Sequence, residues 1–156
     1  MLPADNIKPK SIMEAVIGPL GESEISQVVD FIFTLVPQPR IITFTGNLGA
    51  GKTTLIRALL KAMNSKDEAS SPTFGIVNEY HTGKSRLVCH TDWYRAKSAE
   101  ELLDAGLLEY IHNDECLMLI EWPEVGMALL EGENCLHVQI EYRDDQRLYK
   151  FSDRLS

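Results

Sequence analysis

The residues from Gly46 to Thr53, Gly-Asn-Leu-Gly-Ala-Gly-Lys-Thr, have the glycine, lysine and threonine spacing of a phosphate-binding loop. The apolar run 40–45 before them is predicted to be a buried strand, and the run 55–63 after them a helix. A helix that begins after such a loop binds anions, because its first N–H groups have no intrahelical partner and its dipole favours negative charge. Lys52 would therefore reach the β- and γ-phosphates of a nucleoside triphosphate, and the Thr53 hydroxyl would bind Mg²⁺.

We predict that the nucleotide is bound by the loop and the residue after it, namely Asn47, Leu48, Gly49, Ala50, Gly51, Lys52, Thr53 and Thr54. The alternative is a glycine-rich turn that binds no ligand. The chain lacks the Asn-Lys-x-Asp pattern with which guanine-specific proteins read the base, and it lacks an Asp-x-x-Gly switch. ATP is therefore favoured over GTP.

Two carboxylates follow predicted buried strands and, with Lys52, are the candidates for catalysis. Glu121 follows the apolar run 116–120, and Asp92 lies just after the run 86–90. A carboxylate at the carboxyl end of a strand lies at the ligand edge of an open α/β sheet. Glu121 would hold Mg²⁺ or its water, while Asp92 would bind Mg²⁺ directly, bind it through water, or position the attacking water. The structural alternatives are a surface glutamate in a turn and an aspartate that caps a turn or helix.

Three further residues carry weaker signals. Thr73 lies between the loop helix and the next predicted strand, where switch-type nucleotide binders place a hydroxyl that senses the γ-phosphate. By composition alone, that segment is only a turn. Trp122 is either a core aromatic or an exposed contact, and its spacing favours the core. His90 is interpreted as a packed strand residue rather than a base.

The remaining patterns predict an α/β fold, with one domain over residues 1–156. The wholly apolar run 116–120 is typical of a central parallel strand. Hairpins are expected over 73–81 with 85–91 and over 135–143 with 147–151, and helices over 22–36, 98–112 and 123–130. Ser98 and Glu101 form a capping-box pattern at the start of the second helix. Residues 12–17 fit an edge strand or a short helix equally well.

Composition narrows the classes of function. The net charge of -8 argues against a chain that grips nucleic acid by itself, since phosphate-backbone binding needs a basic face. The acidic residues are unevenly distributed along the sequence, because the stretch 100–133 holds ten carboxylates and no Lys or Arg. That stretch is either a solvated acidic surface or a docking face for a basic protein partner.

The three cysteines, Cys89, Cys116 and Cys135, fit no metal-site spacing and are interpreted as small core residues in a reducing compartment. The sequence shows no signal peptide, and no apolar run approaches the length of a membrane span. We therefore expect a cytoplasmic protein that does not interact with membranes.

Four blocks together resemble the TsaE family, small bacterial ATPases of tRNA threonylcarbamoyladenosine synthesis. They occur in the family's order and cover roughly half the chain: GNLGAGKTT at 46–54, SPTF at 71–74, HTDWYR at 90–95 and IEWPE at 120–124. The first block is common to many phosphate-loop proteins, whereas the later three are more specific. Asn47 stands where the family commonly has Asp, with little effect expected because that position contributes mainly backbone.

The resemblance implies a three-layer P-loop fold with parallel central strands and flanking antiparallel strands. It implies that Thr53 and Glu121 hold Mg²⁺, that Asp92 and Thr73 lie close to the γ-phosphate, and that Trp122 is a functional contact. It also implies weak ATPase activity that supports the TsaB and TsaD proteins, with tRNA contacted only through that complex.

Two other functions use the same loop. A small-molecule kinase would need an arginine-bearing lid, and no Arg lies between Arg95 and Arg143. The second alternative is a non-catalytic binding module whose binding is controlled by ATP. Hydrolysis would then be incidental to its function.

Overall fold

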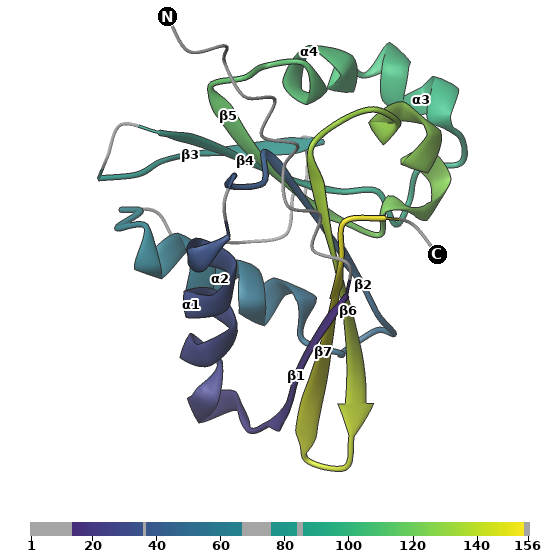
Figure 1. The fold of residues 1–156 in the computed structure, drawn as a ribbon. Helices are drawn as coiled ribbons and strands as arrows, with labels where there is room; N and C mark the ends of the chain where they lie inside the picture. Colours follow the sequence, from purple (N-terminus) through teal and green to yellow (C-terminus); the bar gives the residue numbers. More distant parts are fainter. Residues whose placement is uncertain (1–13, 36, 67–75, 84–85, 155–156) are drawn as a thin grey trace, which may run out of the picture.

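The computed structural model describes residues 14–35, 37–66, 76–83 and 86–154, which form one seven-stranded mixed sheet with helices on both faces (Figure 1). The strand order is β1-β7-β6-β2-β5-β4-β3. The strands are β1 (Ala15–Leu20), β2 (Ile41–Thr45), β3 (Val77–His81), β4 (Leu87–Asp92), β5 (Cys116–Glu121), β6 (Cys135–Arg143) and β7 (Gln146–Ser152).

The centre of the sheet is parallel and its two sides are antiparallel. β2 pairs in parallel with both β5 and β6, and β4 pairs in parallel with β5. The hairpins β3–β4 and β6–β7 are antiparallel, and β1 adds antiparallel to β7. This arrangement confirms the predicted parallel centre and both predicted hairpins. It also places the carboxyl ends of β2, β4, β5 and β6 at one edge of the sheet.

Helices cover both faces because the central strands are apolar on both sides. The α-helices are α1 (Ser26–Thr34), α2 (Lys52–Ala62), α3 (Ala99–Asp104) and α4 (Leu107–Ile111), and the 3₁₀ segments are η1 (Glu22–Glu24) and η2 (Pro123–Leu130). Ile42 and Phe44 of β2 pack in the core with α1 and α2, whereas Ile41 packs with α3, α4 and η2 on the opposite face. Figure 1 shows these two helical layers on opposite sides of the sheet.

Several predicted elements have different boundaries in the structure. The described end of the segment predicted over 12–17 enters the edge strand β1, which starts at Ala15, so the strand alternative holds there. The helix predicted over 22–36 consists of η1 and α1, and α1 ends at Thr34. The helix predicted over 98–112 is interrupted at Gly106, whose φ of +84° ends α3 and precedes α4.

The cap of α3 is formed in part as predicted. The Ser98 hydroxyl accepts a hydrogen bond from the backbone N–H of Glu101 at 3.2 Å. The Glu101 carboxylate accepts from the backbone N–H of Lys97 at 2.8 Å rather than closing the box on Ser98 itself. Ser98 is therefore the N-cap of α3, and Glu101 binds the backbone of Lys97, the residue before Ser98.

All three cysteines are buried with free thiols, as expected for core residues. Among the helices in the described part of the chain, none combines the length and apolar character needed to cross a bilayer.

Candidate functional site

The phosphate-binding loop connects the carboxyl end of β2 to the start of α2. The chain passes through glycines with positive φ, +148° at Gly46 and +108° at Gly51. A Cβ on Gly46 would lie 2.6 Å from the carbonyl oxygen of Ile140 on the neighbouring strand β6, so only glycine fits there. The 11-residue helix α2 begins directly after the loop, and its N-terminus is therefore oriented as an anion-binding helix start.

Lys52 lies across the loop rather than in solvent. Its Nζ donates to the carbonyl oxygens of Gly46 at 2.7 Å and Asn47 at 3.0 Å, and only 6% of the residue is exposed. Burial lowers the pKa of Lys52 from its usual value, against the opposing charges of Glu121, Asp92 and Glu124. The ammonium group is thus held at the loop's own carbonyl oxygens, beside the start of α2.

Glu121, at the end of the neighbouring strand β5, contacts the start of α2. The Thr53 hydroxyl donates to Oε1 of Glu121 at 2.8 Å, and Nε2 of His90 lies 2.8 Å from Oε2. Burial alone raises the pKa of the Glu121 carboxyl, but the contacts with His90 and Thr53 and the charge of Lys52 outweigh it and hold that pKa below its usual value. Glu121 is therefore an ionised, buried carboxylate at the ligand edge, not the surface glutamate of the structural alternative.

Asp92 lies directly opposite Glu121 in the β4–β5 register. Its Oδ1 accepts from the backbone N–H of Tyr94 at 2.9 Å, so Asp92 does cap a turn, as the structural alternative supposed. Burial raises the pKa of Asp92; the Tyr94 N–H opposes this rise, and the charge of Glu121 adds to it. The turn contact and a position beside the phosphate site are compatible, since residues opposite each other on adjacent strands are about 5 Å apart.

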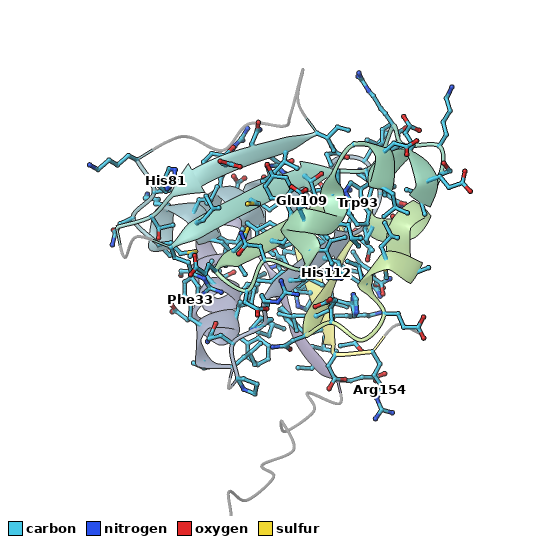
Figure 2. All side chains as sticks on the ribbon, turned by 90° about the horizontal axis from the view of Figure 1, so that it is seen from above. Phe33, His81, Trp93, Glu109, His112 and Arg154 are labelled. Atoms are coloured by element: carbon cyan, nitrogen blue, oxygen red, sulfur yellow. The ribbon has the colours of Figure 1, made fainter. Side chains whose placement is uncertain are left out.

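Trp122 is not the core residue that its spacing favoured. It is partly exposed with a φ of +53°, and its ring lies 4.1 Å from Nζ of Lys52 in a cation–π contact. The Tyr94 ring is 4.8 Å away. The core aromatic of this region is Trp93, which Figure 2 shows beside the helices that cover this face.

The oxygen atoms around the helix start suit a hard divalent cation. The Thr53 hydroxyl and the Glu121 carboxylate are in contact, and Asp92 is on the adjacent strand end. Mg²⁺ in nucleotide sites is typically held by one or two carboxylates together with phosphate oxygens and water. Within the described ranges, no group of three or more His, Cys, Asp or Glu side chains could hold a metal ion. The protein ligands available to such a cation at the start of α2 are the Thr53 hydroxyl and the Glu121 carboxylate.

A cleft of about 550 Å³ extends from the loop to the carboxyl end of β6. Residues 46–50 line one side and residues 139–143 the other. At the β6 end, the Tyr142 ring is exposed on one face, and the Arg147 guanidinium lies 4.0 Å from its centre. Nε of Arg147 also donates to the Ala50 carbonyl oxygen at 2.8 Å, so the terminal hairpin and the loop are directly connected.

Sequence reasoning did not assign Tyr142 and Arg147 to the site. They follow no motif, and they reach the loop only because β6 pairs with β2 and the β6–β7 hairpin returns the chain there. Thr73, the predicted phosphate sensor, lies outside the described residues, so its role stays a prediction. The remaining predicted site residues, from Asn47 to Thr54 with Asp92, Glu121 and Trp122, lie on the loop, on the first turn of α2, or at the ends of β4 and β5.

Several known proteins with similar sequences carry the same name. The chain is 38% identical to "tRNA threonylcarbamoyladenosine biosynthesis protein TsaE" of Haemophilus influenzae over 69% of its length and 66% of that protein. It is 37% identical to the Aquifex aeolicus protein of that name, over 67% of the chain and 73% of the relative. For the Bacillus subtilis protein of that name the identity is 35%, over 72% of the chain and 68% of the relative.

The fold is similar to a solved structure as well. The crystal structure of Bacillus subtilis YdiB superposes with a TM-score of 0.64 at 25% sequence identity, covering 90% of this chain and 84% of that one. The family model described as "Threonylcarbamoyl adenosine biosynthesis protein TsaE" matches residues 21–149, which include the loop, both strand-end carboxylates and most of the terminal hairpin. The chain therefore belongs to the TsaE family of tRNA threonylcarbamoyladenosine biosynthesis proteins.

Proposed function

We propose that this protein binds ATP with Mg²⁺ and hydrolyses it slowly, in support of a TsaB–TsaD complex that carries out threonylcarbamoyladenosine modification of tRNA. The observation that carries the proposal is the contact between Thr53 at the start of α2 and Glu121 at the end of β5. It joins the phosphate-binding loop to an ionised carboxylate from a different strand. Phosphoryl transfer depends mainly on such positioning and on compensation of charge.

Each residue has a distinct part in the proposed reaction. Lys52 leaves the loop carbonyls and neutralises charge on the β- and γ-phosphates. Thr53 and Glu121 hold Mg²⁺, which when bound offsets the charge of the phosphate oxygens. Asp92 is close enough to the same edge to hold a metal-bound water or to orient the attacking water.

The cleft beside the loop suits the nucleoside end of ATP. It lies on the β6 side of the loop, whereas Glu121 and Asp92 lie on the β5 side, so a bound nucleotide would extend from one side of the loop to the other. The exposed face of Tyr142 offers a stacking surface for a base, and Arg147 supports its other face. We place the adenine in this cleft.

The test is steady-state ATP hydrolysis with Mg²⁺, first by this protein alone and then with a purified TsaB–TsaD pair and tRNA. We expect low activity alone and an increase of several-fold with the pair, because Lys52 is the cation that the loop itself supplies and a partner can add a second one. A rate that the pair leaves unchanged would argue against the role in the complex. A screen for phosphoryl transfer to small molecules would then decide whether the loop serves a kinase.

A further inference from the structure

A fully buried histidine holds the carboxylate beside the phosphate loop. His90 lies on β4 with none of its surface exposed, and its Nε2 is 2.8 Å from Oε2 of Glu121. The other carboxylate oxygen accepts the Thr53 hydroxyl at 2.8 Å. Glu121 is therefore held at both oxygens, by a strand on one side and by the start of α2 on the other.

The hydrogen bonding of the ring identifies its tautomer. Nδ1 of His90 is buried and has no hydrogen-bond partner within the described part of the chain. A proton on Nδ1 would leave a buried N–H donor unsatisfied, which costs more than a buried lone pair on an acceptor. The ring proton is therefore assigned to Nε2, which donates it to Glu121.

We propose that His90 is a positioning residue that presents Glu121 to the Mg²⁺ site, an inference that rests on the proposed function. Because His90 occupies Oε2, the oxygen that faces Thr53 and the metal position is always Oε1. Without His90, Oε2 would be a buried charged atom with no partner among the described residues, and the carboxylate would rotate or draw in water. Residues that orient metal ligands in this way typically contribute about 10- to 100-fold to metal affinity.

The experiment measures Mg²⁺ binding rather than turnover. A slowly hydrolysed ATP analogue is bound to the full-length protein, and Mg²⁺ is titrated in by calorimetry; analogue affinity is also measured in EDTA. The variants are His90→Phe, which keeps the ring shape without a hydrogen bond, and His90→Gln, whose amide nitrogen can occupy the place of Nε2. The matched control is His137→Phe, which removes a histidine hydrogen bond to Thr43 (2.7 Å) from the same sheet without contacting Glu121.

We expect His90→Phe to raise the Mg²⁺ concentration at half-saturation by about 10- to 100-fold, with His90→Gln and His137→Phe within about threefold of wild type. Analogue affinity in EDTA should be the same in all four proteins. If the phenylalanine variant does not fold, His90→Asn replaces it, since its amide is too short to reach Oε2.

Two results would overturn the proposal: an unchanged Mg²⁺ midpoint in the Phe or Asn variant, or a glutamine variant as impaired as that variant. Wild-type protein whose analogue binding does not respond to Mg²⁺ at all would instead overturn the proposed function, on which this inference depends. The failures of the two ideas are therefore distinguishable within one set of titrations.

Discussion

At the residue scale, the polar side chains of the candidate site are already paired with protein groups. Lys52 donates to two loop carbonyls, Thr53 donates to Glu121, and the Asp92 carboxylate accepts a backbone N–H. Under the proposed function, phosphates would replace the contacts of Lys52, whereas the contact between Thr53 and Glu121 would be kept around the metal. Substitutions of single residues can distinguish these two kinds of contact.

Replacing Glu121 with alanine removes the carboxylate that accepts the Thr53 hydroxyl and leaves the backbone of the loop in place. We expect Mg²⁺-dependent ATP turnover to fall by at least about 10- to 100-fold, while affinity for the nucleotide in EDTA is largely kept. The comparison is Glu131→Ala, which deletes an exposed carboxylate ten residues further along. An undiminished ATPase rate in the Glu121 variant would show that this residue does not hold the metal.

Trp122 should report on the movement of Lys52. Since Nζ of Lys52 lies 4.1 Å from the Trp122 ring, withdrawal of Lys52 to a phosphate changes the environment of that indole. We expect ATP to change the intrinsic fluorescence, and Trp122→Phe to abolish the change. The chain has only two tryptophans, and Trp93 is 1% exposed, so Trp93 provides a constant background. A response that survives in the Phe variant would contradict the assignment.

At the element scale, the site is assembled from segments that meet only through strand pairing. The loop follows β2, Glu121 ends β5, Asp92 ends β4 and Tyr142 lies near the end of β6. β2 pairs with β5 and β6, so the phosphate side and the cleft lie on opposite flanks of one strand. Changes near the end of β6 should therefore affect nucleotide binding, whereas changes in the helical packing away from the site should affect stability.

The terminal hairpin should contribute to nucleotide affinity but little to turnover of bound ATP. Tyr142→Ala removes the exposed ring in the cleft, and loss of one base–aromatic stack costs about 1–3 kcal/mol. We expect a higher Kd for ATP, measured by calorimetry, with the rate at saturating ATP maintained. The comparison is Asp145→Ala in the hairpin turn, which is exposed and does not line the cleft. Equal affinities in both variants would place the base elsewhere.

The packing of η2 on α3 should be sensitive to one added methyl group. A Cβ on Gly126 would lie 2.6 Å from Cδ1 of Leu102 and 2.6 Å from the Trp93 ring. Gly126→Ala should therefore destabilise the protein by about 1–3 kcal/mol through overpacking. Thermal unfolding checks this, with Gly21→Ala as the control because its nearest non-neighbouring atom is 3.6 Å away. Equal melting temperatures in the two variants would contradict the packing described here.

At the scale of the whole molecule, negative charge is concentrated on one part of the surface. Of the ten carboxylates in the stretch 100–133, all but Glu121 and Glu133 are exposed. They come from α3, α4, η2 and the adjoining loops, with Glu109 of α4 visible in Figure 2. Arg40 pairs with Asp114 and Glu133, which neutralises only the end of the stretch near β2.

If this acidic stretch is a docking face, its contribution should depend on salt. We expect Kd for a TsaB–TsaD pair to rise strongly as salt is added, because exposed charges are screened beyond about 8–10 Å near physiological ionic strength. Glu109→Lys should weaken binding further, whereas Asp145→Lys, the same change of charge in the terminal hairpin, should not. Binding that is indifferent to salt would leave the stretch as a solvated surface.

Much of the fold could be predicted because its determinants are local. The apolar run at 116–120, the glycine loop and the alternation in the terminal hairpin each reflect the period or turn chemistry of one element. The ends of the individual helices and strands were less predictable. The break at Gly106 depends on a left-handed residue that the helical periodicity on either side conceals.

By itself, the sequence determined the phosphate loop, the two strand-end carboxylates, the α/β class and, through four motif blocks, the family. These follow from residue type and from spacing within single elements. Only the tertiary structure decided that His90 contacts Glu121, that Trp122 lies against Lys52 rather than in the core, and that Arg147 reaches the loop. Each of these contacts joins residues 31 to 97 positions apart, because strand order and register, which no local pattern encodes, set which side chains meet.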